Sequence, residues 1–150
     1  MAPTLHATLV FEREISASPK AVFAAFADPA ARAQWGLPSD TAVVIYDDAD
    51  FRAGGQDHFR CGPKTNPNIH GVTHYLDIVP DRRVISSETL VVDGGRLCVS
   101  LTTLELAPDG DKTRLKNTTQ LASFIGEAMV NGHTMGTDAA LDSLVRYFSP

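Results

Sequence analysis

The chain has 150 residues, of which 43% are hydrophobic and 21% are charged, and its formal net charge at pH 7 is -5. This length predicts one domain, residues 1–150, with a core that needs neither a disulfide framework nor a structural metal. Thirteen scattered basic residues against eighteen acidic ones exclude a nucleic-acid partner. We also find no apolar run of the roughly 20 residues that span a bilayer, and no signal-peptide pattern. These features predict a cytoplasmic protein with no membrane partner.

The first third of the chain predicts one strand followed by two short helices. Apolar and polar side chains alternate over residues 5–15, which is typical of a strand. The serine–proline pair at residues 18–19 is a helix N-cap with proline at the first helical position, and apolar residues then recur at helical spacing. The aspartate–proline pair at residues 28–29 repeats the signal, so "PAARAQW" predicts a second helix that ends near Gly36.

After Pro38 the chain is strand-like for most of its remaining length. Turn-forming separators such as "GPKTNPN", "DGG" and "APDGDK" divide it into hairpins, so the predicted sheet is antiparallel. The six predicted strands are "TAVVIYDD", "GGQDHFRC", "NIHGVTHYLDIV", "RRVISSETLVV", "RLCVSLTTLEL" and "TRLKNTTQL".

A long amphipathic helix is predicted from about Asn131 to the end, because Leu141, Leu144 and Val145 stand at helical spacing. A seven-stranded antiparallel sheet needs one face covered, and only this helix is long enough to cover it. The predicted fold is therefore α+β, with a curved seven-stranded antiparallel sheet wrapped around a long C-terminal helix. The concave space between them is a usual kind of ligand site.

Several stretches, in order over nearly the whole chain, resemble one family. They are "REISASPKAVFAAFADPAARAQW", "GGQDHF", "YLDIVPDRRVI", "DGDKTRLKN" and "GHTMGTDAALDSLVRYF". The family is that of heat-shock-protein-90 ATPase activator homologues, a branch of the START-like (SRPBCC or helix-grip) superfamily. The resemblance implies the helix-grip fold but does not settle the function. Asp57 stands where the family commonly has an aromatic residue, and Thr137 where it commonly has Trp, which predicts a wider or more polar cavity.

The stretch "DHFRCGPKTNPNIHGVTHY", residues 57–75, predicts a hairpin in which His58 lies opposite Val72. In a sheet covered on one side the apolar face turns inward. We therefore expect one face, with Phe59, Cys61 and Tyr75, to line the groove. The other face, exposed to solvent, carries His58, Arg60, His70 and His74.

Two other interpretations of this hairpin stay open. The histidines could bind zinc, although no acid or thiol shares their face to complete the ligand shell. A register slip of one residue would instead turn the imidazoles inward, where one could act as a general base. The two cysteines, Cys61 and Cys98, are far apart in strand-like surroundings, which favours reduced, packed thiols. We predict no metal.

The predicted groove residues come from four regions. In the last strand Asn117 and Thr119 share an apolar face, where they either bind water or orient the polar end of a ligand. The other candidates, Trp35 at the end of the second helix and the methionines around the last helix, are side chains that either pack in the core or contact a ligand. The full set is Trp35, Phe59, Cys61, Tyr75, Asn117, Thr119, Met129 and Met135.

The function predicted from these residues is binding of a small apolar or amphipathic molecule, without a cofactor. The sequence contains no Gly-x-Ser-x-Gly turn, phosphate-binding glycine loop or HExxH helix. Asp77 and Glu88 are expected to point into solvent. Two alternatives remain: a cyclase- or hydratase-like enzyme using acid and base groups of the groove, and a chaperone- or protein-interaction module. A homodimer is also open.

Overall fold

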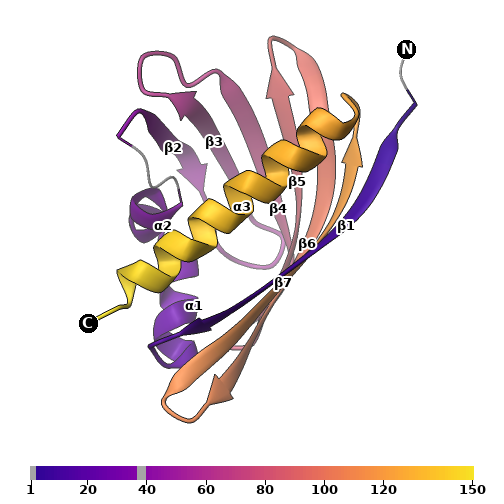
Figure 1. The fold of residues 1–150 in the computed structure, drawn as a ribbon. Coiled ribbons are helices and arrows are strands. Elements are labelled where there is room, and N and C mark those ends of the chain that lie inside the picture. Colours follow the sequence, from indigo (N-terminus) through magenta and orange to yellow (C-terminus); the bar gives the residue numbers. More distant parts are fainter. Residues whose placement is uncertain (1–2, 37–39) are drawn as a thin grey trace.

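The computed structural model describes residues 3–36 and 40–150. Within them, seven strands form one antiparallel sheet in the order β1-β7-β6-β5-β4-β3-β2, and three helices pack on its concave side (Figure 1). The predicted α+β helix-grip fold is confirmed. The elements are β1 (Leu5–Ile15), α1 (Pro19–Ala27), α2 (Pro29–Trp35), β2 (Ala42–Ala49), β3 (Gln56–Pro63), β4 (Ile69–Val79), β5 (Arg83–Val92), β6 (Gly95–Asp109), β7 (Lys112–Ser123) and α3 (Glu127–Tyr147).

The strand order explains why two helices follow β1. Strands β2 to β7 are joined in sequence, each next to the one before it, whereas β1 pairs with β7 at the opposite edge from β2. The segment between β1 and β2 must therefore cross the whole sheet, and α1 and α2 lie in this connection (Figure 1). This crossing places the two helices beside the strands that will form the cavity.

Both short helices begin as predicted. The Ser18 hydroxyl accepts a hydrogen bond from the Ala21 amide at 3.2 Å, and Asp28 Oδ1 accepts one from the Ala30 amide at 3.0 Å. Each cap satisfies an amide that lacks a partner within the helix, and each is followed by a proline that needs none.

Helix α3 crosses the concave face of the sheet diagonally and packs mainly on β1 and β7 (Figure 1). Leu141 and Leu144 are buried, and Arg13 on the inner face of β1 binds Asp138 and Asp142 at 2.9 and 3.0 Å. The helix begins at Glu127, earlier than the predicted start near Asn131. Its N-cap is Gly126, which makes no side-chain cap, so the sequence there carries no start signal. In the described part of the chain no helix is long and apolar enough to cross a membrane.

The hairpin of β3 and β4 has the predicted register. His58 pairs with Val72 and Gln56 with His74, so the register slip is excluded. The three histidines are exposed on the outer face, and Arg60, also on that face, forms an ion pair with Asp47 of β2 at 2.8 Å. In residues 3–36 and 40–150 there is no group of three or more side chains that could hold a metal.

A candidate ligand cavity beneath the short helices

A cavity of about 310 Å³ opens on the concave face of the sheet. Its described lining comes from α1, α2, every strand except β1 and the segments that follow α2 and β2, and none of it comes from α3. Because α3 packs mainly on β1 and β7, it leaves the inner face of β3 to β6 uncovered beside it. The cavity therefore lies next to α3, between the sheet and the short helices.

One wall of the cavity is aromatic. Phe51 packs edge-on against Tyr75 with ring centroids 4.9 Å apart, and the rings of Tyr46 and Phe59 are 5.9 Å apart. Phe59 of β3 pairs with Gly71 of β4, and because Gly71 has no side chain there is room for the Phe59 ring. The local sequence produces part of this wall. Side chains along a strand point alternately to the two faces of the sheet, and the aromatic residues Phe59 of β3 and Tyr75 of β4 occupy inward-pointing positions. The aromatic lining residues are Phe26, Tyr46, Phe51, Phe59 and Tyr75.

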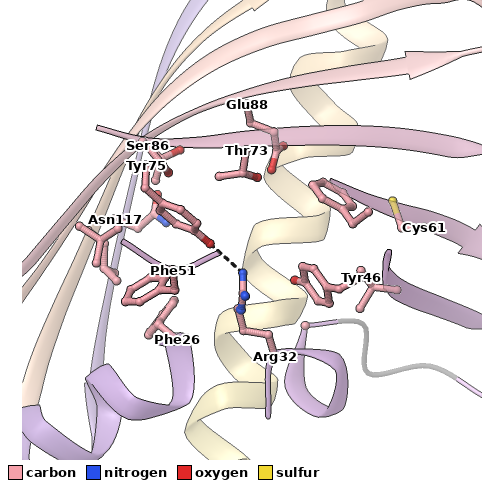
Figure 2. A pocket seen from close by; sticks show the side chains of 16 residues that line it. Phe26, Arg32, Tyr46, Phe51, Cys61, Thr73, Tyr75, Ser86, Glu88 and Asn117 are labelled. Carbon is pink, nitrogen blue, oxygen red and sulfur yellow. Dashed lines mark hydrogen bonds between the residues drawn. The ribbon is translucent and has the colours of Figure 1, made fainter. Parts of the chain in front are cut away.

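The neighbouring part of the same sheet surface presents polar side chains to the cavity. These come from four neighbouring strands, and the register places Thr73 opposite Glu88 and Ser86 opposite Thr102. Figure 2 shows Thr73 and Glu88 side by side on this wall. The cavity thus joins an aromatic surface to a row of hydroxyl, amide and carboxyl groups. The polar lining residues of the sheet are Thr73, Ser86, Glu88, Thr102 and Asn117.

A buried polar cluster connects α2 to the sheet at the edge of the cavity. Arg32 Nη1 donates to Asp57 Oδ2 at 2.5 Å and to the Tyr75 hydroxyl at 2.8 Å, the bond drawn in Figure 2. Tyr75 donates its own hydrogen to Asp57 Oδ2, and the Asp50 amide donates to Asp57 Oδ1. Asp57 is only 1% exposed, so its charge is balanced by Arg32 rather than by water.

Tyr75 is held as a hydrogen-bonded phenol. Burial, together with the hydrogen bond to Asp57, raises its pKa above the ordinary value of a tyrosine, although Arg32 acts in the opposite direction. A phenol of raised pKa, whose hydrogen already points at a carboxylate, is a poor proton donor to a substrate. Tyr75 therefore positions Arg32 and Asp57 and offers its ring to the cavity.

The sequence predicted that Glu88 points into solvent, and this prediction is wrong. It lies on the inner face of β5 and lines the cavity. Burial raises its pKa to about 7, and a hydrogen bond from Thr73 opposes that effect. In the described residues no ion pair involves Glu88. Asp77, in contrast, is at the surface as expected and pairs with Arg83 at 2.7 Å.

The two cysteines are free thiols. Cys61 lines the cavity, and Cys98 of β6 is buried. Burial, with Glu88 nearby, raises the pKa of each thiol to about 11. The reactive form of cysteine is the thiolate, so these groups act as apolar, packed side chains at neutral pH.

The structure brings four of the predicted groove residues together at the cavity: Phe59, Cys61, Tyr75 and Asn117. Thr119 lies behind them, buried, and donates to Asn117 Oδ1 at 2.9 Å, so it orients the amide from outside the cavity.

Trp35 and the two methionines do not line this cavity. The Trp35 indole is buried and donates to the Ala25 carbonyl at 3.1 Å, and its ring contacts Phe26, which does line the cavity. Met129 is half-buried near the start of α3, and Met135 is 72% exposed. Trp35 thus packs the two short helices together, whereas Met135 faces solvent.

Several cavity residues were not singled out from the sequence. Arg32 and Trp35 are three positions apart in a helix, and this spacing, which places them on neighbouring parts of one face, was the available signal. Val44 and Tyr46 alternate within "TAVVIYDD", which also indicates an inward face. The stretch around Glu88, "ISSETL", has no clear alternation, so its inward face could not be assigned.

Comparison with known proteins agrees with this fold. A family model described as "Activator of Hsp90 ATPase homolog 1-like protein" matches residues 16–149. The chain belongs to this family. No curated protein matches the chain.

Three solved structures similar to this family member come from bacteria. A protein from Rhizobium loti is 36% identical, with a TM-score of 0.85 over 97% of this chain and 99% of its own. One from Rhizobium leguminosarum is 28% identical, with a TM-score of 0.82 over 97% and 96% of the two chains. One from Chromobacterium violaceum is 26% identical, with a TM-score of 0.77 over 96% and 99%. This chain and the three solved structures thus share the helix-grip architecture over nearly their whole length.

Proposed function

We propose that the protein binds a small, largely apolar molecule in the cavity between the sheet and the short helices. One observation carries this proposal: a cavity of about 310 Å³ lined by an aromatic wall and by a row of polar side chains. Apolar walls supply most of the binding free energy, and a few polar groups fix the orientation of the ligand. The volume is at the small end of ligand pockets, which run from about 300 to 1,000 Å³.

The proposal is tested with a neutral fluorescent probe, N-phenyl-1-naphthylamine, and two matched variants. Ser86→Phe places a ring inside the cavity, whereas Ser87→Phe places the same ring on the opposite face of β5. We expect the wild type and Ser87→Phe to bind the probe with equal affinity and Ser86→Phe to lose binding. Equal binding by all three proteins would mean that the probe sits elsewhere.

A second function, proton transfer on a bound carbonyl compound, is favoured by the position of Glu88. A carboxyl group whose pKa is about 7 can both give and take a proton near neutral pH. Thr73 and Ser86 provide hydroxyls on the same wall. The charged pair Arg32 and Asp57 beside Tyr75 also favours a cavity that handles polar groups over a purely apolar one.

The enzymatic alternative predicts exchange of the acidic hydrogens next to a ketone. In D2O, the wild type should accelerate deuterium uptake at the α-carbon of 2-tetralone, as followed by proton NMR. Glu88→Gln should reduce the rate to the uncatalysed background while binding of the neutral naphthylamine persists. A wild-type rate equal to the background would count against this second function and leave ligand binding unaffected.

An outer-surface role is less well supported than the cavity. The most exposed large apolar side chains come from separate elements, namely Val10 of β1, Leu76 of β4 and Met135 of α3. A protein-interaction module is expected to gather such side chains in one patch. A cytoplasmic location, a single domain over residues 1–150 and a homodimer remain predictions from the sequence.

A further inference from the structure

Arg32 is a cation built into the wall of the cavity. It projects from α2 between Tyr46 and Tyr75, as Figure 2 shows, and is only 8% exposed. The carbon of its guanidinium lies 4.5 Å from the centroid of the Tyr46 ring, so an aromatic face covers one side of the group. The cluster with Asp57 and Tyr75 fixes its position.

This cluster uses only one of the three guanidinium nitrogens. Nη1 donates to both Asp57 and Tyr75, whereas Nε and Nη2 are buried and have no hydrogen-bond partner among the described residues. A buried N–H of a charged group that lacks an acceptor is costly, and native proteins rarely leave one unsatisfied. An acceptor is therefore expected on this side of Arg32.

The geometry of the free donors indicates what the acceptor is. Nε and Nη2 lie on one edge of the planar guanidinium, where their N–H bonds run parallel and match the two oxygens of a carboxylate. Arg13 in this chain uses the same two nitrogens for acids: its Nε binds Asp142 and its Nη2 binds Asp138. At Arg32 no side chain of the described residues takes that place.

We propose that the cavity binds small carboxylic acids, whose carboxylate accepts hydrogen bonds from Nε and Nη2 of Arg32 while the apolar part lies against the aromatic wall. This inference rests on the proposed function and adds the chemical class of the ligand. The charge of Asp57 holds Arg32 in place without occupying the edge that faces the acid. Among the described residues, Glu88 is the one acid that lines the cavity.

Calorimetry with matched acids and amides tests the proposal on the unmodified protein. The probes are 2-naphthoic acid and octanoic acid, each compared with its primary amide, which has nearly the same shape but no charge. Measurements at about pH 6 keep Glu88 mostly neutral, because its pKa is raised to about 7. We expect at least one acid to bind on the order of tenfold or more tightly than its amide.

The possible results separate this inference from the proposed function. If acid and amide bind equally well, the cavity binds small molecules but the carboxylate site at Arg32 is wrong. If neither acid nor amide of either pair binds, both proposals fail. Preference for an acid supports the site only if the Nε–H resonance of Arg32 also shifts when that acid is added.

The Nε–H resonance of Arg32 reports on the edge directly. In a proton–nitrogen NMR spectrum this signal should shift on titration with the preferred acid and not with its amide. Arg32→Lys, which keeps the charge but lacks the planar edge, assigns the signal by its absence and should lose the preference for acid. The control Arg60→Lys, on the outer face, should keep it. If Arg32→Lys does not fold, the Arg32 Nε–H resonance is assigned in the wild type by through-bond spectra, and its response to the acid tests the proposal. A resonance that does not shift with the acid overturns the proposal.

Discussion

Tyr75 donates its phenolic hydrogen to Asp57 Oδ2, and both side chains are buried on the inner face of the sheet. The two residues pack on neighbouring strands, and Arg32 from α2 binds both of them. This contact therefore joins the position of a helix to the shape of the cavity. Changes at Tyr75 are expected to affect stability and binding together.

Tyr75→Ala and Tyr75→Phe separate the ring from the hydroxyl. Truncating a buried aromatic side chain costs about 3–5 kcal/mol of unfolding free energy, so we expect a loss of this size for Tyr75→Ala. Tyr75→Phe keeps the ring but removes one donor from Asp57, which should cost about 1–2 kcal/mol. Urea denaturation measures both. A loss below about 1 kcal/mol for Tyr75→Ala would contradict the burial of this ring.

Glu88 should make stability fall as pH rises. Because its folded-state pKa of about 7 lies above the ordinary glutamate value of 4.5, the folded protein binds more protons than the unfolded chain between these values. The contribution of Glu88 is therefore fully present below pH 4.5 and is lost as pH rises through 7.

The variant Glu88→Gln removes this titration. Relative to the variant, the wild type should lose about 1–3 kcal/mol of unfolding free energy between about pH 4.5 and pH 8, as measured by denaturant titration at each pH. Glu105→Gln, at an exposed position of β6, is the control and should follow the wild type. Parallel curves for wild type and Glu88→Gln would show that Glu88 is solvated.

Gly71 is predicted to let the Phe59 ring lie flat against the sheet, at the wall of the cavity. A Cβ at residue 71 would overlap the Phe59 ring, which lies over the glycine from the neighbouring strand. Gly71→Ala should therefore displace the ring, cost about 1–3 kcal/mol of unfolding free energy and weaken binding of N-phenyl-1-naphthylamine.

A double variant shows whether the ring is the cause. In Gly71→Ala combined with Phe59→Ala, the overlap is gone, so the double variant should lose less stability than the sum of the two single losses. If the stability losses of the two single variants are additive in the double variant, the effect of Gly71→Ala comes from the backbone and not from overlap with the Phe59 ring.

The sequence predicted the fold well because its signals are local. The pairs Ser18-Pro19 and Asp28-Pro29 mark helix starts through their caps. In residues 57–75 the turn predicted the register, and the alternation of polar and apolar residues predicted the inward face. Glu88 could not be placed in the same way. The pattern "SSETL" is polar at consecutive positions, and the register of β5 is fixed by β4, which has a bulge between Tyr75 and Asp77.

Arg32 is the other residue that sequence reasoning could not place. Its partners Asp57 and Tyr75 are far away in the sequence, and a charged residue in a short helix is most often solvated. Asp57 interrupts the aromatic pattern that the family commonly has, and Arg32 is the group that compensates its charge. Such a pair becomes visible only when strand and helix are placed together.

Substitution of the three exposed histidines is expected to leave stability and probe binding nearly unchanged. His58, His70 and His74 lie on the outer face of β3 and β4, away from the cavity. Changing all three to Gln should alter the unfolding free energy by no more than about 0.5 kcal/mol per residue and leave probe binding unchanged. Thermal unfolding and fluorescence titration check the two expectations, and loss of binding would give these side chains a part in the site.

The central claim is that the cavity holds a small molecule, and native mass spectrometry of protein purified from its own host tests it most directly. We expect a recurrent adduct of defined mass on the wild type and on Ser87→Phe, and its absence from Ser86→Phe, whose added ring fills the cavity. An adduct retained equally by all three proteins, or a wild type that carries none and binds no probe, would contradict the claim.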